Sequence, residues 1–357
     1  MPPAGYLTAA GIESGLLYLS TTYPALCQLT VLPETTAGGR TSRALRLRAG
    51  GPGERRGVLL VAGLHARELV NPDLLLSFAL RLCQVYTAGT KITFGPKSYT
   101  AARVRQVLQG LDLFVFPLVN PDGRAYVQSP AGDPWWRKNR SPNGGAACRG
   151  VDINRNFDFL WSSGIGSSAS PCDYQVYRGP AAFSEPETRN VRHLLDANPA
   201  IAYFLDLHSY AREMYYPWGD DNNQTTDPAM SFTNPAYNGL RGQPGDSLYR
   251  EYLPAADQTR ARAVAVRVTN AIKAVRGTVY TPMQGVGLYP TSATSDDYCS
   301  SRHFADPAKP RVWGFSIETG DEFQPPYSEA LQIIAEVSIE KPQTRGLAGS
   351  AKCRLLQ

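Results

Sequence analysis

The 357-residue chain lacks any apolar run close to the roughly 18 residues that a membrane-spanning helix needs. It also lacks clustered basic runs, because its net charge of +5 is spread along the sequence. We therefore expect neither a membrane nor a nucleic acid as a partner. Hydrophobic residues make up 43% of the chain, which is typical of a globular protein, and length alone allows one large α/β domain or two ordinary ones.

Cysteine is scarce. Six cysteines are too few for a disulfide scaffold at this length, and no Cys-x-x-Cys pair indicates structural zinc or redox chemistry. The N-terminal residues 1–6 lack the charged and apolar regions of a secretory signal. We therefore expect either an intracellular chain or a mature form that has lost a leader.

Apolar periodicity predicts strands that alternate with helices. The strands are expected at 29–32, 44–48, 57–64, 111–119, 201–207 and 311–317, and the helices at 11–19, 74–85, 257–275 and 327–340. Asn71, followed by Pro72, is expected to cap the second helix, and a capping box at Ser184-Glu-Pro-Glu187 predicts a further helix through Leu195. The segment Asn120-Pro-Asp-Gly123 is predicted to be a turn.

This alternation predicts an α/β fold with a mixed, mostly parallel twisted sheet and helices on both faces. No internal repeat or linker divides the chain, so residues 1–340 are expected to form a single domain, and 341–357 a frayed tail. Two long segments rich in Gly, Pro and Asn, 130–147 and 217–247, are expected to form loops over a crevice.

Three of the predicted strands end in residues that can bind a metal or move a proton. His65-Ala-Arg-Glu68 follows the first of these strands, His208 follows the second, and Glu318 ends the third. Open α/β sheets place their sites outside the carboxyl ends of the strands, so we expect these side chains to meet in one crevice. A His-x-x-Glu pair by itself is also an ordinary surface feature, and it gains significance here from its position.

His65, Glu68 and His208 are the three protein ligands that a zinc hydrolase needs, with a fourth position left for water. Glu318 could accept a proton from that water, although a buried ion-pair partner at the end of a strand would follow the same pattern. The other two histidines, His193 and His303, lack a carboxylate at metal spacing and are expected to be surface or structural residues.

Taken together, these segments resemble the zinc metallocarboxypeptidase family of carboxypeptidases A, B and T, over about residues 6–340. Seven motifs occur in the family's order: His65-Ala-Arg-Glu68, Asn120-Pro-Asp-Gly123, Trp136-Arg-Lys138, Gly150-Val-Asp-Ile-Asn-Arg-Asn-Phe157, Leu207-His-Ser-Tyr210, Leu288-Tyr289 and Glu318. The resemblance implies a zinc carboxypeptidase fold and hydrolysis of the C-terminal peptide bond of peptides and proteins, by a monomer.

The resemblance also implies roles for individual residues. His65, Glu68 and His208 would hold one zinc ion per chain, and Glu318 would be the general base and acid. Arg137 would stabilise the oxyanion that forms when water attacks the scissile carbonyl. From the residues alone, Arg137 would be interpreted as a solvated loop charge.

Substrate-binding residues follow from the same resemblance. Asn154 and Arg155 match residues that hold the terminal carboxylate of the substrate, for which a guanidinium group is suited. Tyr289 matches a mobile tyrosine that closes over the carboxylate, although core packing is its ordinary interpretation. Arg67 and Tyr210 match residues that line neighbouring subsites.

Asp296 falls where the B-type enzymes have an aspartate at the base of the side-chain pocket, which would favour Lys or Arg at the substrate's C-terminus. An Asp pair at this point, Asp296 and Asp297, could instead cap a helix. Residues 217–256 form a longer segment than in the pancreatic enzymes, and this length resembles bacterial and fungal relatives. No inhibitory prodomain is recognisable ahead of residue 6.

Cys148 and Cys172 match a family disulfide, and such a bond would favour an oxidising compartment and a secreted protein. Two reduced buried thiols in a cytosolic protein are the alternative. No pairing is proposed for Cys27, Cys83, Cys299 or Cys353. The glycosylation sequons at Asn139 and Asn223 are interpreted as incidental, because a glycan at Asn139 would crowd Arg137.

The predicted function is that of a zinc metallocarboxypeptidase. One alternative is a bacterial cell-wall peptidase of the same fold, in which the residues that bind the carboxylate would be altered. The other is a binding module that keeps the fold but has lost its chemistry. The intact Asn154, Arg155 and Tyr289 argue against the first alternative, and the presence of every ligand and of Glu318 argues against the second.

Overall fold

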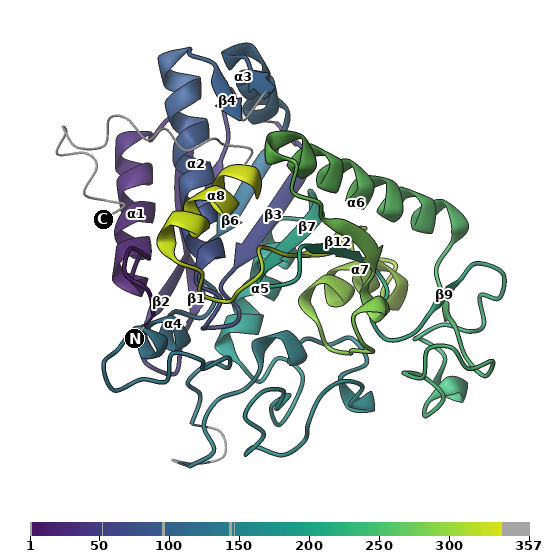
Figure 1. The fold of residues 1–357 in the computed structure, drawn as a ribbon. Helices are drawn as coiled ribbons and strands as arrows, with labels where there is room; N and C mark the ends of the chain where they lie inside the picture. Colours follow the sequence, from purple (N-terminus) through teal and green to yellow (C-terminus); the bar gives the residue numbers. More distant parts are fainter. Residues whose placement is uncertain (1, 52, 95–96, 143–144, 146, 338–357) are drawn as a thin grey trace.

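The computed structural model describes residues 2–337 apart from 52, 95–96, 143–144 and 146, and it is an α/β fold built on one central sheet (Figure 1). The strands of this sheet are β1 (Cys27–Thr35), β2 (Thr41–Leu47), β3 (Gly57–Ala62), β6 (Asp112–Phe116), β7 (Ile201–His208), β8 (Glu213–Tyr216), β11 (Thr281–Gln284) and β12 (Trp313–Glu318). Two short pairs lie outside it, β4 (Ile92–Phe94) with β5 (Lys97–Tyr99) and β9 (Asn223–Gln224) with β10 (Glu251–Tyr252).

The strand order of the main sheet is β1-β2-β6-β3-β7-β12-β8-β11. Its centre is parallel, because β3 pairs in parallel with both β6 and β7, and β7 pairs in parallel with β12. The antiparallel pairings lie toward the edges, between β1, β2 and β6 on one side and between β12 and β8 on the other. The predicted mixed, mostly parallel sheet is confirmed, and β3, β7 and β12 are direct neighbours.

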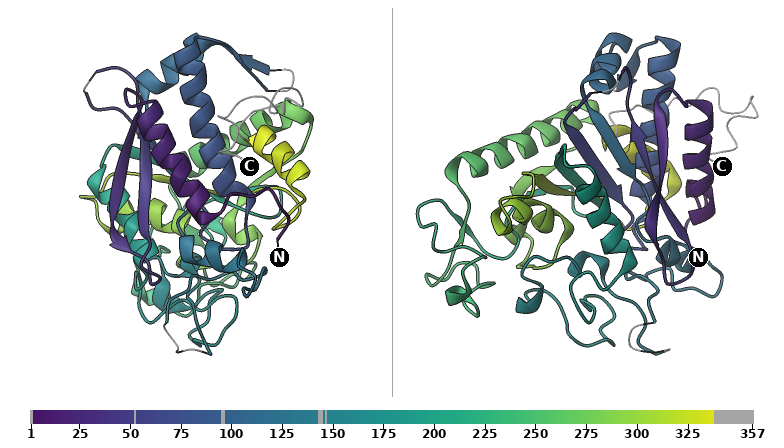
Figure 2. Two further views of the ribbon diagram at one scale, coloured as in Figure 1. Left: turned by 90° about the vertical axis from the view of Figure 1, so that its left-hand side faces the viewer. Right: turned by 180° about the vertical axis from the view of Figure 1, so that it is seen from behind.

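Helices cover both faces of the sheet (Figure 2). They are α1 (Ala9–Thr22), α2 (Val70–Ala88), α3 (Ala101–Gly110), α4 (Pro121–Val127), α5 (Pro186–Ala197), α6 (Ala255–Arg276), α7 (Ser295–Ala305) and α8 (Tyr327–Val337), with short 3₁₀ turns η1 (Ile153–Arg155), η2 (Trp161–Ser163), η3 (Pro235–Tyr237) and η4 (Gly285–Gly287).

Two apolar cores lie between these layers. One joins α1, α2, α6 and α8 to one face of the sheet, and the other joins α5 and α7 to the opposite face. Strand β6 contributes to both, because Leu113 and Val115 belong to the first core while Phe114 and Phe116 belong to the second. This is the alternation of side chains expected along a strand that is buried on both faces.

The prediction of a turn at 120–123 was wrong, because this segment begins helix α4. The side-chain oxygen of Asn120 accepts a hydrogen bond from the Gly123 amide at 2.8 Å, and Pro121 occupies the first helical position. Asn120 therefore caps the helix, and Pro121 is its first residue. Asn and Pro are favoured at these helix positions as well as in β-turns, so the sequence alone suited either structure.

Two predicted helix caps also differ from the structure. Helix α2 begins at Val70, so Asn71 lies inside it, and Leu69 is at the cap position. Helix α5 begins at Pro186 with Glu185 at the cap position and no side-chain capping bond, so the capping box at Ser184 was wrong although the helix itself was right. Helix α3 and strands β8 and β11 were not predicted, and helix α7 was anticipated only in the alternative interpretation of the Asp296–Asp297 pair as a helix cap.

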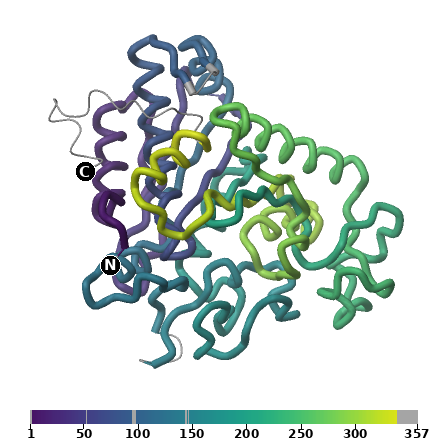
Figure 3. Tube along the Cα trace, in the orientation of Figure 1, coloured from purple at the N-terminus to yellow at the C-terminus, as the bar shows by residue number. Residues whose placement is uncertain are grey.

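The long loops gather at one end of the molecule. The tube in Figure 3 shows the segment between α4 and α5 along the bottom of the view and the segment between β8 and α6 at its right-hand side. Short elements interrupt the second segment, since β9, η3 and β10 fall between residues 217 and 254.

Within the described residues, no helix is both long enough and apolar enough to cross a membrane. The predicted tail 341–357, with Cys353, lies outside these residues, and the helix predicted at 327–340 is described as far as Val337.

Candidate active site

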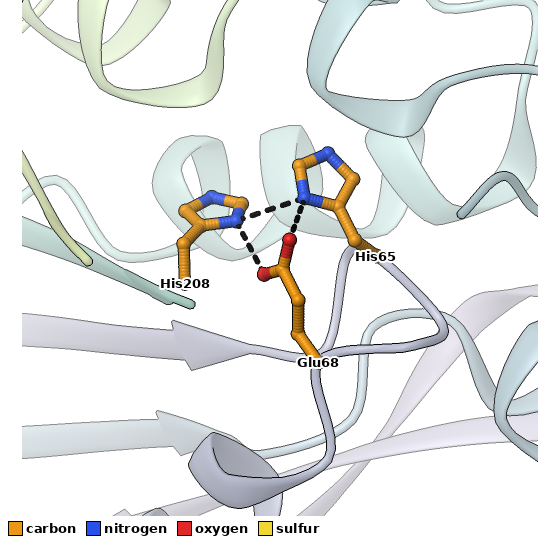
Figure 4. A group of neighbouring side chains, drawn as sticks. All are labelled: His65, Glu68 and His208. Atoms are coloured by element: carbon orange, nitrogen blue, oxygen red, sulfur yellow. Dashed lines mark hydrogen bonds and ion pairs between the residues drawn. The ribbon is translucent and has the colours of Figure 1, made fainter. Parts of the chain in front are cut away.

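His65, Glu68 and His208 come together at the carboxyl edge of the sheet, as their positions after two neighbouring strands predicted. Nδ1 of His65 lies 2.7 Å from Oε1 of Glu68, and Nδ1 of His208 lies 3.0 Å from Oε2 of the same carboxylate. The two Nδ1 atoms are 3.1 Å apart. Figure 4 shows both imidazole rings turned toward the Glu68 side chain.

These three residues form a buried donor set of the kind that a catalytic zinc uses. Their ligand atoms all lie within 4.8 Å of one another, and each side chain is almost entirely shielded from solvent. Two imidazoles and one carboxylate leave a fourth coordination position open for water or substrate. Burial would raise the pKa of Glu68, but the positive charges of His65 and His208 hold it below its usual range. The residues therefore fit a bound Zn²⁺.

Glu318 lies beside the donor set, at the end of β12. It is opposite His208 in the parallel pairing of β12 with β7. Burial, together with the negative charge of Glu68, raises the pKa of Glu318 to about 8, and a cation held by the donor set would act in the opposite direction. Oε2 of Glu318 is buried without a hydrogen-bond partner in the described part of the chain. The carboxylate is therefore available to a bound water.

Arg137 reaches the same site from the loop that follows α4. Its Nε donates to Oδ2 of Asp152 at 3.0 Å, and its Nη2 lies 3.0 Å from the same oxygen. The other oxygen of Asp152 lies 3.2 Å from Nε2 of His65. Burial would raise the pKa of Asp152, but the charge of Arg137 holds it well below its usual range. Asp152 thus contacts both Arg137 and His65, one of the three converging donors.

Asn154 and Arg155 are positioned by the 3₁₀ turn η1, which Asp152 caps through the Asn154 amide. Nδ2 of Asn154 lies 3.4 Å from Nε2 of His208. The buried Arg155 donates through Nη2 to the hydroxyl of Tyr289 at 3.2 Å, while Tyr289 is 45% exposed. Tyr289 therefore contacts the buried guanidinium group from the exposed side of the pocket.

Arg67 and Tyr210 are not among the residues that line the pocket containing His65 and Glu318, and both contact Phe323. The Arg67 guanidinium lies 4.1 Å from the centre of the Phe323 ring and donates to the Trp135 carbonyl. Tyr210 packs edge-on against the same Phe323 ring, with the ring centres 4.8 Å apart. Phe323 was not identified from the sequence, and it joins the two predicted subsite residues into one cluster.

Asp296 and Asp297 form part of the wall of a pocket beside the metal donors. Both are buried in the first turn of α7, and burial raises the pKa of each. Oδ2 of Asp297 accepts a hydrogen bond from the Gly219 amide at 2.9 Å. The pocket is lined by His65, Arg137, Asn154, Arg155, His208, Tyr215, Gly219, Gly285, Leu288, Tyr289, Thr291, Thr294, Asp296, Asp297, Ser316 and Glu318.

A family model described as zinc carboxypeptidase matches residues 12–339 of the chain. The chain belongs to this family. Among curated zinc carboxypeptidase relatives, it is 34% identical to carboxypeptidase B of Astacus astacus over 210 residues, which cover 58% of this chain and 62% of that protein. It is 29% identical to carboxypeptidase B of Homo sapiens over 289 residues, which cover 80% of this chain and 58% of that protein.

The match to a carboxypeptidase B of Helicoverpa zea covers 48% of that relative, so the chain spans about half to three fifths of these longer proteins. Among solved structures, bovine thrombin-activatable fibrinolysis inhibitor in complex with tick carboxypeptidase inhibitor gives a TM-score of 0.70 at 22% identity, over 94% of both chains. Carboxypeptidase A of Helicoverpa armigera gives 0.68 at 22% identity, over 94% of this chain and 71% of that one. The zinc carboxypeptidase fold predicted from the motifs is confirmed.

The cysteines of this zinc carboxypeptidase chain divide into bonded and free residues. Cys148 and Cys172 form a disulfide that closes a loop containing η1 and η2, as the resemblance implied. Cys27 and Cys83 are free and buried, with their Sγ atoms 3.3 Å apart, and Cys299 is also free and buried.

His193, His303 and Asn139 were expected to be surface, structural or incidental residues. His193 is exposed on α5, and Nδ1 of His303 lies 2.8 Å from the Lys309 carbonyl oxygen. Asn139 is fully buried and donates to Glu185 at 2.7 Å, which agrees with an incidental sequon.

Two carboxylates that contact the histidine donors were not identified from the sequence of this carboxypeptidase family member. Asp152 contacts His65 and Asp206 contacts His208. Asp206 had a signal in the sequence, because residues two apart on a strand share a face and Asp206 precedes His208 by two. Asp152 had none of this kind, because it lies in a loop 87 residues from His65.

Proposed function

We propose that the chain is a zinc-dependent metallocarboxypeptidase that hydrolyses the C-terminal peptide bond of peptides and proteins. One observation supports this above the others. Asn154 lies 3.4 Å from the metal ligand His208, and its neighbour Arg155 is bonded to Tyr289. A group that can bind a carboxylate is therefore one residue away from the metal site. This proximity restricts reaction to the last peptide bond.

In this proposal, three residues bind the terminal carboxylate of the substrate. Arg155 pairs with the terminal carboxylate, with Asn154 as a second donor, because a guanidinium group can donate two parallel hydrogen bonds to it. Tyr289, which already contacts Arg155, closes over the bound carboxylate and excludes water. A peptide with an amidated C-terminus lacks the negative charge that Arg155 and Asn154 would bind.

The reaction itself uses Glu318 and Arg137. Zinc, when bound by His65, Glu68 and His208, acidifies water and polarises the scissile carbonyl group. Glu318 accepts the proton from the attacking water and then donates it to the departing amine. Arg137 stabilises the negative charge that develops on the carbonyl oxygen, held in place for this by Asp152.

Asp296 gives the proposed enzyme a preference for C-terminal Lys or Arg. Its carboxylate belongs to the pocket that also contains Asn154 and Arg155, so the side chain of a terminal residue held by this pair would point toward it. Pairing with a cation offsets the cost of ionising a buried carboxylate, whereas an apolar terminal side chain would leave that cost uncompensated.

The Cys148–Cys172 disulfide supports an oxidising compartment, and we propose that the protein is secreted.

The deciding experiment offers the zinc-loaded protein two matched peptide libraries, one with free C-termini and one with C-terminal amides. Mass spectrometry should detect loss of one terminal residue from the free acids only, fastest for Lys and Arg. A chelator should abolish this loss and added zinc should restore it. Internal cleavage, equal cleavage of the amides, or no cleavage by stoichiometrically loaded protein would refute the proposal.

A further inference from the structure

The second nitrogen of His208 is engaged by a buried carboxylate. Nδ1 of His208 faces Glu68 and the metal position, whereas Nε2 lies 2.9 Å from Oδ2 of Asp206. Asp206 has no exposed surface. Within the described residues, each of the two histidine ligands therefore has a carboxylate behind it, Asp152 for His65 and Asp206 for His208.

The sheet imposes this arrangement. Asp206 and His208 are two apart on β7, so their side chains leave the strand on the same face. Strand β7 lies between β3 and β12, where Val61 and Ser316 are the neighbours of Asp206 on either side. A carboxylate in the middle of a sheet and covered by a helix is shielded from water, so its interaction with the imidazole is weakly screened.

Asp206 also contacts the wall of the substrate pocket. The Ser295 hydroxyl donates to Oδ2 of Asp206 at 2.5 Å, and the Ser295 amide donates to Oδ1 of Asn154 at 2.8 Å. Ser295 is the first residue of α7, directly before Asp296. A chain of polar contacts therefore runs from His208 through Asp206 and Ser295 to Asn154, which the proposed function assigns to the substrate's carboxylate.

We infer that Asp206 is a positioning residue for the metal site. Its carboxylate accepts the Nε2 proton of His208, which leaves the Nδ1 lone pair pointing at the metal and fixes the plane of the ring. Through Ser295 it also sets the distance between this ligand and the first turn of α7. This inference rests on the proposed function, because it assumes that His208 holds zinc.

Carboxylates behind histidine ligands increase the basicity of the imidazole and restrict its rotation, and their loss typically costs about 10-fold to 100-fold in metal affinity. The Asp206→Asn variant keeps the shape and one acceptor oxygen, so we expect zinc release about 10-fold faster than from the parent protein. The Asp206→Ala variant keeps no acceptor, so we expect release up to about 100-fold faster.

The experiment measures the rate of zinc transfer from the full chain to a chromogenic chelator. Asp152→Asn serves as a comparator at the other histidine. Asp73→Asn is the matched control, because Asp73 is equally buried and bonded to Arg124 but does not contact the metal donors. This control should release zinc at the parental rate. Replacing zinc with Co²⁺ adds a second readout, since a changed ligand field alters the visible spectrum while a loss of stability alone does not.

The outcomes separate the inference from the proposed function. If the parent protein binds no zinc, the proposed function fails. If it binds one zinc per chain and both Asp206 variants release it within twofold of the parental rate with an unchanged Co²⁺ spectrum, the inference is wrong and the proposed function stands. If neither variant folds, Ser295→Ala decides. Release faster than from Asp73→Asn supports the inference, and release at the parental rate overturns it.

Discussion

Arg137 and His65 are held by opposite oxygens of a single buried carboxylate, that of Asp152. Nε of Arg137 lies 3.0 Å from Oδ2 of Asp152, and Nε2 of His65 lies 3.2 Å from Oδ1. Since Asp152 is completely buried, neither contact competes with bulk water. The position of the guanidinium relative to the three converging donors is therefore set before substrate arrives, which is the preorganisation that the proposed oxyanion-stabilising role of Arg137 requires.

Replacing Arg137 with Ala should lower kcat by about 10²-fold to 10³-fold with a smaller change in KM, because the lost interaction forms mainly in the transition state. Steady-state kinetics on a peptide with a free C-terminus would measure both constants. Arg140→Ala is the control, since that guanidinium stacks 3.7 Å from the centre of the Tyr126 ring and does not line the pocket. An effect confined to KM would assign Arg137 to ground-state binding.

Replacing Glu318 with Gln should lower kcat by about 10²-fold to 10⁴-fold, because the amide cannot carry the proton from water to the departing amine. Zinc content, measured by atomic absorption, should be unchanged, since Glu318 is not one of the three converging donors. The surface variant Glu329→Gln should behave as the parent protein. Retained turnover in Glu318→Gln would rule out its role as base.

Replacing Asp296 with Asn should lower kcat/KM for substrates ending in Arg or Lys by about 10²-fold, and should change kcat/KM for those ending in Leu or Phe much less. Asp297→Asn tests the neighbouring carboxylate. Because Oδ2 of Asp297 is already occupied by the Gly219 amide, its replacement should largely preserve the basic preference. The opposite ranking of the two variants would assign the preference to Asp297.

Glu187 should make the stability of the protein depend on pH. It is fully buried and lies beside Glu185, and burial together with that charge raises its pKa from 4.5 to about 8. The folded state keeps this proton up to about pH 8, whereas the unfolded state loses it near pH 4.5. The stabilisation is therefore complete below about pH 4.5 and is lost as the pH rises to about 8, by at most about 1.4 kcal/mol per pH unit.

The Glu187→Gln variant should remove this loss, because a neutral amide can still accept the hydrogen bond that Asn139 now donates to Oε2 at 3.1 Å. Denaturant unfolding at pH 5, 6.5 and 8 would show the free energies of unfolding of variant and parent diverging as pH rises. Profiles that stay parallel across this range would contradict the assignment.

The sequence alone was enough to predict which strand ends carry chemistry. His65, His208 and Glu318 each follow an apolar run that is clear without a structure. Parallel strands bring their carboxyl ends to one edge, so the residues that follow them must meet if the strands are neighbours. The structure confirms that they are, with β7 between β3 and β12.

Local sequence was less informative where polar residues form regular structure. Helix α7 is rich in Ser and Asp and has no apolar repeat, so nothing in its periodicity predicted it. The segment at Asn120 carries residues that suit a turn and a helix cap equally, and only its neighbours favour the helix. Strands β8 and β11 have four residues each, too few for a periodic signal.

The sequence by itself determined the alternating architecture, the three residues that converge as candidate metal ligands and the carboxylate beside them, because each depends on a short stretch of chain. Only the tertiary structure decided what supports them. Asp152 reaches His65 across 87 residues, and Ser295 reaches Asp206 across 89. Contacts of this range depend on strand order and on how the loops pack over the sheet, and no local pattern of residues encodes either.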